Sequence, residues 1–182
     1  MISKTSDEFV ALEGGCTCRA VRYRMNSRPL IVHCCHCRWC QRETGTAFAL
    51  NAMIESDRVD VLEGGHQIEL VDTPSLSGKG QKIARCGICR VAVWSHYAGA
   101  GDALRFVRVG TLDDPDKLPP DIHIFTESKQ PWVCLPPGAA AVPQYYSAGK
   151  YWSEESLARR AVLRAQAEAA PFTTEPSCRG NP

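Results

Sequence analysis

Cysteine spacing constrains the fold of this chain more than any other feature. Ten of the 182 residues are cysteine, and most fall in the three clusters Cys16-x-Cys18, Cys34-Cys35-x-Cys37-x-x-Cys40 and Cys86-x-x-Cys89, while Cys134 and Cys178 stand alone. Thiols one or two residues apart can point at one metal ion from a single tight turn, whereas a disulfide between them is strained. The spacing therefore favours zinc sites over a disulfide framework.

Charge balance and the lack of long apolar segments limit the classes of protein to consider. Lys and Arg number 21 against 20 Asp and Glu, so the chain lacks the basic excess typical of nucleic-acid-binding proteins. The first residues, MISKTSDEFVALEGG, contain no apolar run typical of a signal peptide, and no later segment approaches a membrane span. We therefore expect a soluble, cytoplasmic protein with neither nucleic-acid nor membrane partners.

Strand-like segments dominate up to about residue 135. They are short, rich in β-branched and aromatic residues, and bounded by Gly, Pro or Asp. No long amphipathic helix separates them, which argues against βαβ units and favours a mainly β architecture with antiparallel sheets. The predicted strands are 20–25, 47–54, 59–64, 66–72, 90–97 and 104–112, followed by a Pro- and Asp-rich loop and the short extended return HIFTESKQPWV.

The C-terminal part of the chain changes character. The segment 153–169 predicts a helix that begins after Ser153 as N-cap and carries acidic residues in its first turn. Its short apolar stripe could pack on the same domain or on a second subunit, so a homo-oligomer stays open. The stripe is Leu157, Ala161 and Ala165, and the tail beyond the helix contains Cys178, which we expect to be a free thiol.

Four of the cysteines could complete one metal site. Cys16 and Cys18 supply two thiols, and Cys86 and Cys89 supply two more from about seventy residues away. Four thiolates satisfy a tetrahedral zinc ion and leave it chemically inert. Such a site would cross-link two β ribbons that are distant in sequence.

The stretch HCCHCRWC offers a second, smaller ligand set. Cys35, Cys37 and Cys40 could wrap one face of an ion, and three protein ligands with an open fourth position are typical of catalytic zinc. The alternative is a closed structural site. The residues that could close it are His33, His36 and Cys134.

The residues between these proposed ligands are expected to be bystanders. His36 lies between Cys35 and Cys37, so its side chain should project away from an ion that both neighbours bind. We therefore interpret His36 as a hydrogen-bonded or solvent-facing histidine. Cys34 faces the same objection and should pack as a small apolar group.

Several segments, taken in order, resemble a known family. They are GGCTCRAVRY, CHCRWCQRETGTAF, the CGIC turn before the apolar strand with Trp94, GTLDDP and PPDIHIFTESKQPWV. Residues 9–146 thereby resemble the glutathione-dependent formaldehyde-activating enzyme family, also called the GFA or CENP-V/GFA domain. Residues 147–182 lie outside the resemblance, as a helical extension and tail.

This resemblance implies a mainly β, Mss4-like fold of zinc-bound antiparallel sheets with a C-terminal helix. Where the family usually has glycine, this chain has Arg19 and Arg90, which requires either a left-handed arginine or a different backbone. Two zinc ions are implied. Carried over to this sequence, a structural zinc would be held by Cys16, Cys18, Cys86 and Cys89, and a catalytic zinc with an open fourth position by Cys35, Cys37 and Cys40.

The implied reaction joins glutathione, as co-substrate, to formaldehyde and gives S-(hydroxymethyl)glutathione, so the partners would be a small thiol and an aldehyde. In reverse it is a carbon–sulfur lyase reaction. The alternative is a non-catalytic, zinc-stabilised binding module, because one fold can host several functions and the sequence assigns no general acid. Candidate helper residues are His123, Trp132, Glu43 and Thr44, although each is more often structural, His123 as a packed or hydrogen-bonded histidine and Trp132 as part of the core. Candidate anion-binding residues are Arg38, Arg42 and Lys129, although scattered Arg and Lys are more often solvated.

Overall fold

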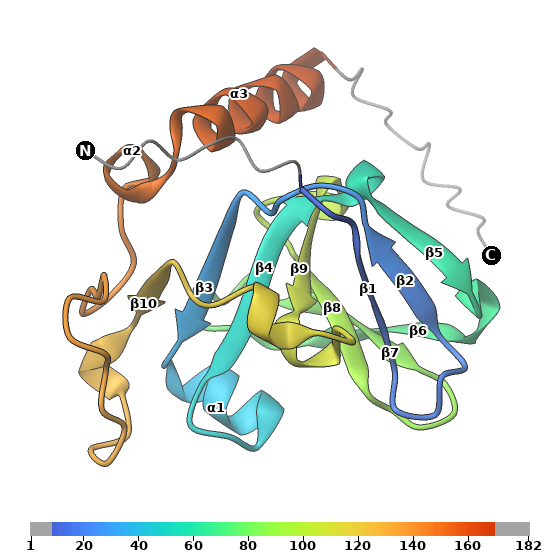
Figure 1. Cartoon of the computed structure of the whole chain (residues 1–182), viewed down its shortest axis with the longest axis horizontal. Coiled ribbons are helices and arrows are strands. Elements are labelled where there is room, and N and C mark those ends of the chain that lie inside the picture. The colour runs from blue at the N-terminus through green and yellow to red at the C-terminus, as the bar shows by residue number, and fades with distance from the viewer. Residues whose placement is uncertain (1–8, 170–182) are drawn as a thin grey trace, which may run out of the picture.

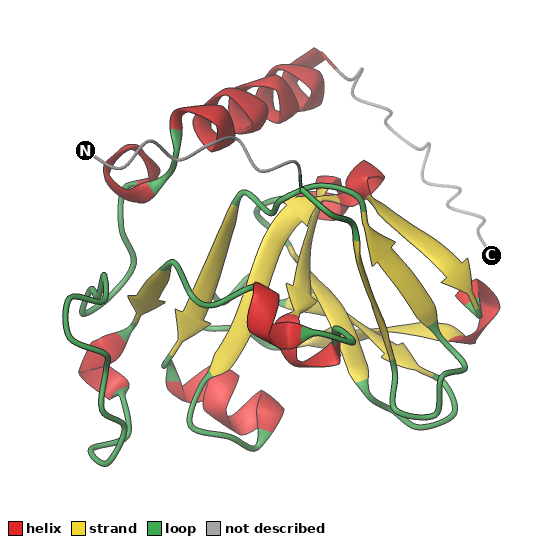
Figure 2. Cartoon of the chain, in the orientation of Figure 1, coloured by secondary structure: helices red, strands yellow, loops and turns green. Residues whose placement is uncertain are grey.

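The computed structural model describes residues 9–169, so Cys178 and the rest of the tail lie outside the described residues. The described chain is mainly β and forms two sheets with a helix at its C-terminal end (Figures 1 and 2). The first sheet contains β1 (Leu12–Gly15), β2 (Arg22–Met25) and β5 (Val59–Glu63), in that order. The second contains, in spatial order, β10 (Ile122–Ile124), β3 (Ile31–Cys35), β4 (Ala49–Glu55), β9 (Leu104–Arg108), β8 (Ala92–Tyr97), β7 (Gln81–Cys86) and β6 (Ile68–Thr73).

Helices are short apart from the last one. They are α1 (Arg38–Thr44), α2 (Ala148–Tyr151) and α3 (Glu154–Ala169). Short 3-10 turns occupy Ser56–Arg58, Gly65–Gln67, Gly101–Ala103, Val109–Thr111, Pro115–Lys117 and Thr126–Ser128. The predicted strand 104–112 therefore ends early, because the chain coils into a 3-10 turn after Arg108.

The mainly β architecture is confirmed, with two differences from the expected pattern. β10 runs parallel to β3, whereas the other paired strands are antiparallel. The sequence analysis also missed β1, β3, β7 and α1. All five residues of β3 are buried, so β3 lacks the alternation of apolar and polar residues by which a half-buried strand is recognised.

The main hydrophobic core lies between the two sheets. Tyr23 of β2 and Trp94 of β8 meet edge to face, with ring centroids 5.8 Å apart, an arrangement that aromatic pairs favour. Ile54 and Val107, from β4 and β9, are fully buried beside them. This core holds the two sheets together.

A second apolar cluster lies on the other side of β3 and β4. Ile31 and Met53 belong to it, together with Ile122 of β10 and Trp152, which follows α2. Cys35, Cys37 and Cys40 are part of the same cluster. In Figure 1, α1 lies at the end of the second sheet opposite to α3, where β3 ends and β4 begins.

The C-terminal helix α3 docks on the second sheet through a buried ion pair. Arg159 donates from Nε to Glu55 of β4 at 2.7 Å and from a terminal nitrogen to the carbonyl oxygen of Arg28 at 2.9 Å. The predicted N-cap is also present, since the Ser156 N–H donates to Ser153 Oγ at 3.1 Å. Of the predicted apolar stripe, Leu157 packs against the second apolar cluster, whereas Ala161 and Ala165 are exposed in the single chain.

We expect Glu55→Gln to lower the free energy of unfolding at neutral pH by about 3 kcal/mol. The buried guanidinium of Arg159 would then face a neutral amide with one accepting oxygen in place of a carboxylate. Burial opposes ionisation of Glu55, but the hydrogen bonds and charge of Arg159 prevail and hold its pKa below 4.5. A carboxyl whose pKa is lower in the folded state stabilises the protein above its unfolded pKa and loses that effect as pH falls through the folded pKa. The difference between wild type and variant should therefore shrink below about pH 4.5.

Urea denaturation across this pH range measures the effect. Glu155→Gln is the matched control, since Glu155 contacts Arg159 at 3.5 Å but its side chain is 75% exposed, and exposed ion pairs contribute about 0.5 kcal/mol. Equal losses in the two variants, or a loss independent of pH, would contradict the role of Glu55.

Within residues 9–169, no helix combines the length and the apolar character needed to cross a membrane.

Candidate active site and metal centres

Cys16, Cys18, Cys86 and Cys89 come together from two turns that lie side by side in Figure 1. The first turn precedes β2 and the second joins β7 to β8. All four Sγ atoms lie within 4.8 Å of one another; Cys16 and Cys18 are 3.5 Å apart, and Cys18 and Cys86 are 3.7 Å apart. Sulfur atoms around a tetrahedral zinc ion lie about 3.8 Å apart, given a Zn–S bond of about 2.3 Å. The four thiols thus fit one zinc ion.

Each of the two turns contains an arginine with a left-handed backbone conformation. Arg19 and Arg90 have φ of 63° and 64°, the left-handed region that glycine usually occupies. Each arginine N–H donates at 2.9 Å to the carbonyl oxygen of the first cysteine in its turn. Of the two alternatives, a left-handed arginine or a different backbone, the structure has the left-handed arginine in both turns.

Cys35, Cys37 and Cys40 form a second cluster, with Sγ atoms within 4.8 Å of one another. Cys35 ends β3, Cys37 is the N-cap of α1, and Cys40 lies in the first helical turn. The Cys40 N–H donates to Cys37 Sγ at 3.3 Å. Hydrogen bonds from the other two thiols and from this N–H lower the pKa of Cys37. The cluster is thus preorganised to hold a thiolate.

These three thiols line a cavity of about 510 Å³. Five aromatic residues and several polar ones line it, and among the described residues Lys79 is the only Lys or Arg in its lining. His33 also lines it but does not belong to the three-cysteine group. His33 Nε2 lies 2.6 Å from Tyr146 Oη, and burial lowers the pKa of His33 to about 4. The aromatic residues are Trp39, Tyr97, Phe106, Phe125 and Tyr145.

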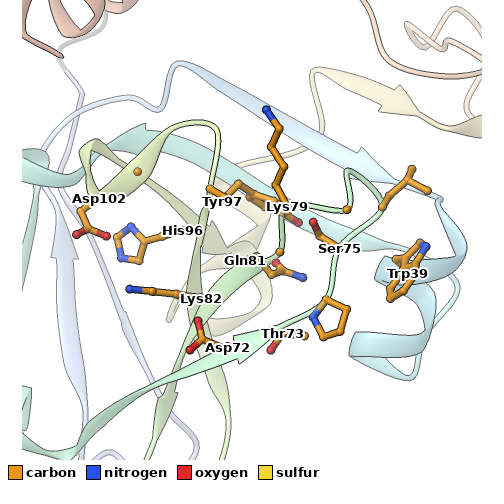
Figure 3. A pocket seen from close by; sticks show the side chains of 16 residues that line it. Trp39, Asp72, Thr73, Ser75, Lys79, Gln81, Lys82, His96, Tyr97 and Asp102 are labelled. Carbon is orange, nitrogen blue, oxygen red and sulfur yellow. The ribbon is translucent and has the colours of Figure 1, made fainter. Parts of the chain in front are cut away.

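An open groove of about 860 Å³ adjoins the cavity and shares Trp39, Lys79 and Tyr97 with it (Figure 3). Strand register places Asp72, Lys82 and His96 in a row across β6, β7 and β8. In Figure 3 Lys82 lies between the other two, with Trp39 on the far side of the groove. This side of the groove therefore presents an acidic, a basic and an imidazole side chain.

Glu43 anchors α1 to the sheet and does not line the cavity. It accepts from Arg85 at 2.7 Å and from Arg108 at 2.8 Å. Arg108 also donates to Ser95 Oγ at 3.1 Å and to Asn51 Oδ1. Asn51 lines the cavity, so this buried network connects the helix that carries Cys40 with the cavity wall.

The segment after β10 clamps the loop between β3 and α1. Gln41 of α1 donates to the carbonyl oxygens of His36 at 2.6 Å and Ser128 at 3.0 Å, and it accepts from Gln130 at 2.9 Å. Ser128 Oγ also donates to the His36 carbonyl oxygen at 3.1 Å. Sequence analysis missed this role of the segment ESKQ because it depends on a contact between residues about ninety positions apart.

The structure leaves the remaining sequence candidates outside the cavity lining. Trp132, expected either as a helper or in the core, is 71% exposed. Thr44 donates to the Cys40 carbonyl oxygen, Arg38 to Gln41, and Lys129 to the carbonyl oxygen of Val133. Arg42 and Cys134 are exposed, and Cys134 belongs to none of the metal-capable groups among the described residues.

A third group, Cys34, His36 and His123, lies on the opposite face of β3. Cys34 Sγ is 3.5 Å from His36 Nε2, which is 3.0 Å from His123 Nδ1. The two imidazole rings stack with centroids 5.3 Å apart. The expectation of a solvent-facing or hydrogen-bonded His36 is only partly right: the residue is fully buried and its Nδ1 has no partner among the described residues. His123 is a packed histidine and does not line the cavity.

Comparison with known proteins identifies the family to which this sequence is similar. The model of a family described as glutathione-dependent formaldehyde-activating enzyme matches residues 11–128. A Halomonas elongata protein, provisionally named as such an enzyme, is 27% identical over 125 residues, which cover 67% of this chain and 79% of that protein. A crystal structure of a Rhodobacter sphaeroides protein aligns with 19% identity and a TM-score of 0.43, covering 56% of this chain and 87% of that one.

Proposed function

Because the chain belongs to the glutathione-dependent formaldehyde-activating enzyme family, we propose that it is a zinc-dependent enzyme of the carbon–sulfur lyase type. Its reaction would join a thiol such as glutathione to formaldehyde or another small aldehyde, and would cleave the adduct in reverse. The observation that carries the proposal is that Cys35, Cys37 and Cys40 open onto a cavity of about 510 Å³. The four-cysteine cluster does not line that cavity.

The two cysteine clusters would hold two zinc ions with different roles. Four thiols complete the coordination of the structural ion, whereas three leave one position of the catalytic ion open. When bound by Cys35, Cys37 and Cys40, zinc would supply a Lewis acid that lowers the pKa of an incoming thiol.

Two side chains that line the cavity can donate hydrogen bonds to the carbonyl oxygen of the aldehyde. In the proposed reaction the thiol sulfur bonds to the carbonyl carbon, the π electrons move to the oxygen, and that oxygen takes up a proton, so no oxidant or reductant is consumed. Burial raises the pKa of Tyr97, so its hydroxyl stays protonated and can donate a hydrogen bond. The Phe106 ring packs edge to face against the Tyr97 ring, with ring centroids 4.7 Å apart. Since Arg108 donates to Asn51 Oδ1, the Asn51 amide group remains as a second donor.

Aromatic side chains, Phe106 and Tyr145 among them, line the cavity beside the three thiols. Their apolar surface lowers the local dielectric and so strengthens electrostatic interactions there. Phe125 takes a left-handed backbone with φ of 56° at this wall. A bulky residue in that conformation is strained, and such strain is common at functional sites.

Turnover by the zinc-loaded protein tests the proposed function. Exchange between formaldehyde and the S-hydroxymethyl adduct of glutathione can be followed by NMR, with 2-mercaptoethanol and a larger aldehyde as alternative substrates. We expect the protein to accelerate exchange for at least one pair. Uncatalysed rates for every pair, with zinc bound at both clusters, would instead favour the non-catalytic binding module.

We expect Lys79→Gln to raise KM for glutathione about two- to five-fold with little change in kcat, because an exposed charge pair contributes up to about 1 kcal/mol to binding. Glutathione carries two carboxylates, and Lys79 is the lysine that lines the cavity. Lys82→Gln is the matched control, since Lys82 lines only the outer groove. A thiol without a carboxylate, 2-mercaptoethanol, should show no change in KM; equal effects of both variants would contradict the assignment.

A further inference from the structure

One strand presents potential metal ligands on both of its faces. Because side chains alternate along β3, Cys35 faces the cavity and Cys34 faces the other way. β10 pairs in parallel with β3 and places His123 directly beside Cys34. His36, two residues after Cys34, returns to the same side. The Cys34 Sγ, His36 Nε2 and His123 Nδ1 atoms consequently lie within 4.8 Å of one another.

This group is costly to bury without a ligand. The exposed fractions are 2% for Cys34, 0% for His36 and 8% for His123. His36 Nε2 and His123 Nδ1 can share one proton at 3.0 Å, yet in either tautomer the buried His36 Nδ1 has no partner among residues 9–169. A buried polar atom without a partner costs about 1–3 kcal/mol. Apolar side chains would avoid that cost, so stability alone does not account for the group.

We propose that Cys34, His36 and His123 form a third metal site, for a soft monovalent ion of the Cu(I) type. Thiolate and imidazole together are ligands that copper and zinc prefer, and trigonal Cys-His₂ sets are known for copper. Bonds of about 2.0 Å to nitrogen and 2.3 Å to sulfur, as for zinc, place neighbouring ligand atoms roughly 3.5–3.7 Å apart in a trigonal site, and copper bonds are of similar length. The separations of 3.5 and 3.0 Å therefore need only a small spread of the two rings.

Charge selects the monovalent ion. Cysteine binds as thiolate and histidine as neutral imidazole, so a monovalent ion makes the buried complex neutral. A divalent ion would leave one uncompensated positive charge in the core, which is expensive, and no carboxylate belongs to this group among the described residues. Zinc would also need a fourth ligand. The site is separate from the proposed active site, because its ligands face the other side of β3.

Copper uptake by the full-length, zinc-loaded protein tests the inference. The protein is titrated anaerobically with Cu(I) in competition with bicinchoninate, and zinc release is followed in the same samples. We expect one equivalent of Cu(I) to bind per chain without zinc release. Cys34→Ser should weaken that binding by at least about 100-fold, because replacing even an outer residue of a metal site costs 10–100-fold. Cys134→Ser, which removes an exposed thiol outside the group, should bind copper like wild type.

X-ray absorption of the Cu(I)-loaded wild type provides a second measurement that needs no variant. The site predicts one sulfur and two nitrogen neighbours around copper. Copper surrounded by sulfur alone, or taken up only as zinc is released and equally in Cys34→Ser, would place it at the other cysteine clusters and overturn the proposal. The absence of any uptake would overturn it as well.

Discussion

Cys86→Ser is expected to leave the chain largely unfolded at 25 °C, and removal of zinc from the wild type by a strong chelator should do the same. Structural zinc contributes about 10–16 kcal/mol in small zinc domains, as much as the whole stability of an ordinary domain, about 5–15 kcal/mol. Cys86 is fully buried, and its Sγ lies 3.7 Å from that of Cys18, sixty-eight positions away. Its loss therefore removes a ligand from the cross-link between two turns that are distant in the sequence.

Circular dichroism with and without chelator measures this effect. Cys134→Ser is the control, since Cys134 is exposed and belongs to no cysteine cluster in the described chain; surface substitutions change stability by about 0.5 kcal/mol or less. A melting temperature that does not respond to zinc removal would show that the four-thiol cluster is not a structural metal site.

Cys37→Ser should abolish most turnover while keeping the fold. Cys37 Sγ accepts from the Cys40 N–H as the N-cap of α1, and serine is among the best N-cap residues. The helix should therefore form, whereas the metal loses a thiolate. We expect kcat/KM for thiol–aldehyde exchange to fall by at least about 100-fold, since even residues that only support a metal ligand contribute 10–100-fold.

Metal analysis separates the role of Cys37 as a metal ligand from its role as the N-cap of α1. Zinc content should fall from two ions per chain to one, with an unchanged far-ultraviolet spectrum. If the ion is lost but exchange proceeds at the wild-type rate, the chemistry does not occur at Cys35, Cys37 and Cys40. Cys134→Ser, which keeps both clusters, should retain wild-type turnover.

Local spacing predicted both the grouping of the cysteines and the helix α3. Cys35, Cys37 and Cys40 lie within six residues, so the end of a strand and one helical turn suffice to bring their thiols together. Ser153 caps α3 as its position indicated. The sequence left two alternatives at Arg19 and Arg90, a left-handed arginine or a different backbone, and the structure has the first.

Strand register was beyond the reach of the sequence alone. The parallel pairing of β10 with β3 places His123 beside Cys34, and neither residue carries a local signal of the other. Lys79 and Tyr97 were missed for the same reason, since only the folded sheet brings them to the three thiols. For Trp132 the sequence predicted too much burial: its apolar ring suggested a core position, but the side chain is 71% exposed.

The sequence by itself therefore determined which cysteines form each short cluster, since that spacing is a property of a few neighbouring residues, whereas the fold brought Cys16 and Cys18 to Cys86 and Cys89. The tertiary structure decided which cluster faces a cavity and which side chains surround it. That decision depends on the face to which each strand residue points and on the partner that each strand selects, and a shift of one residue would reverse every face.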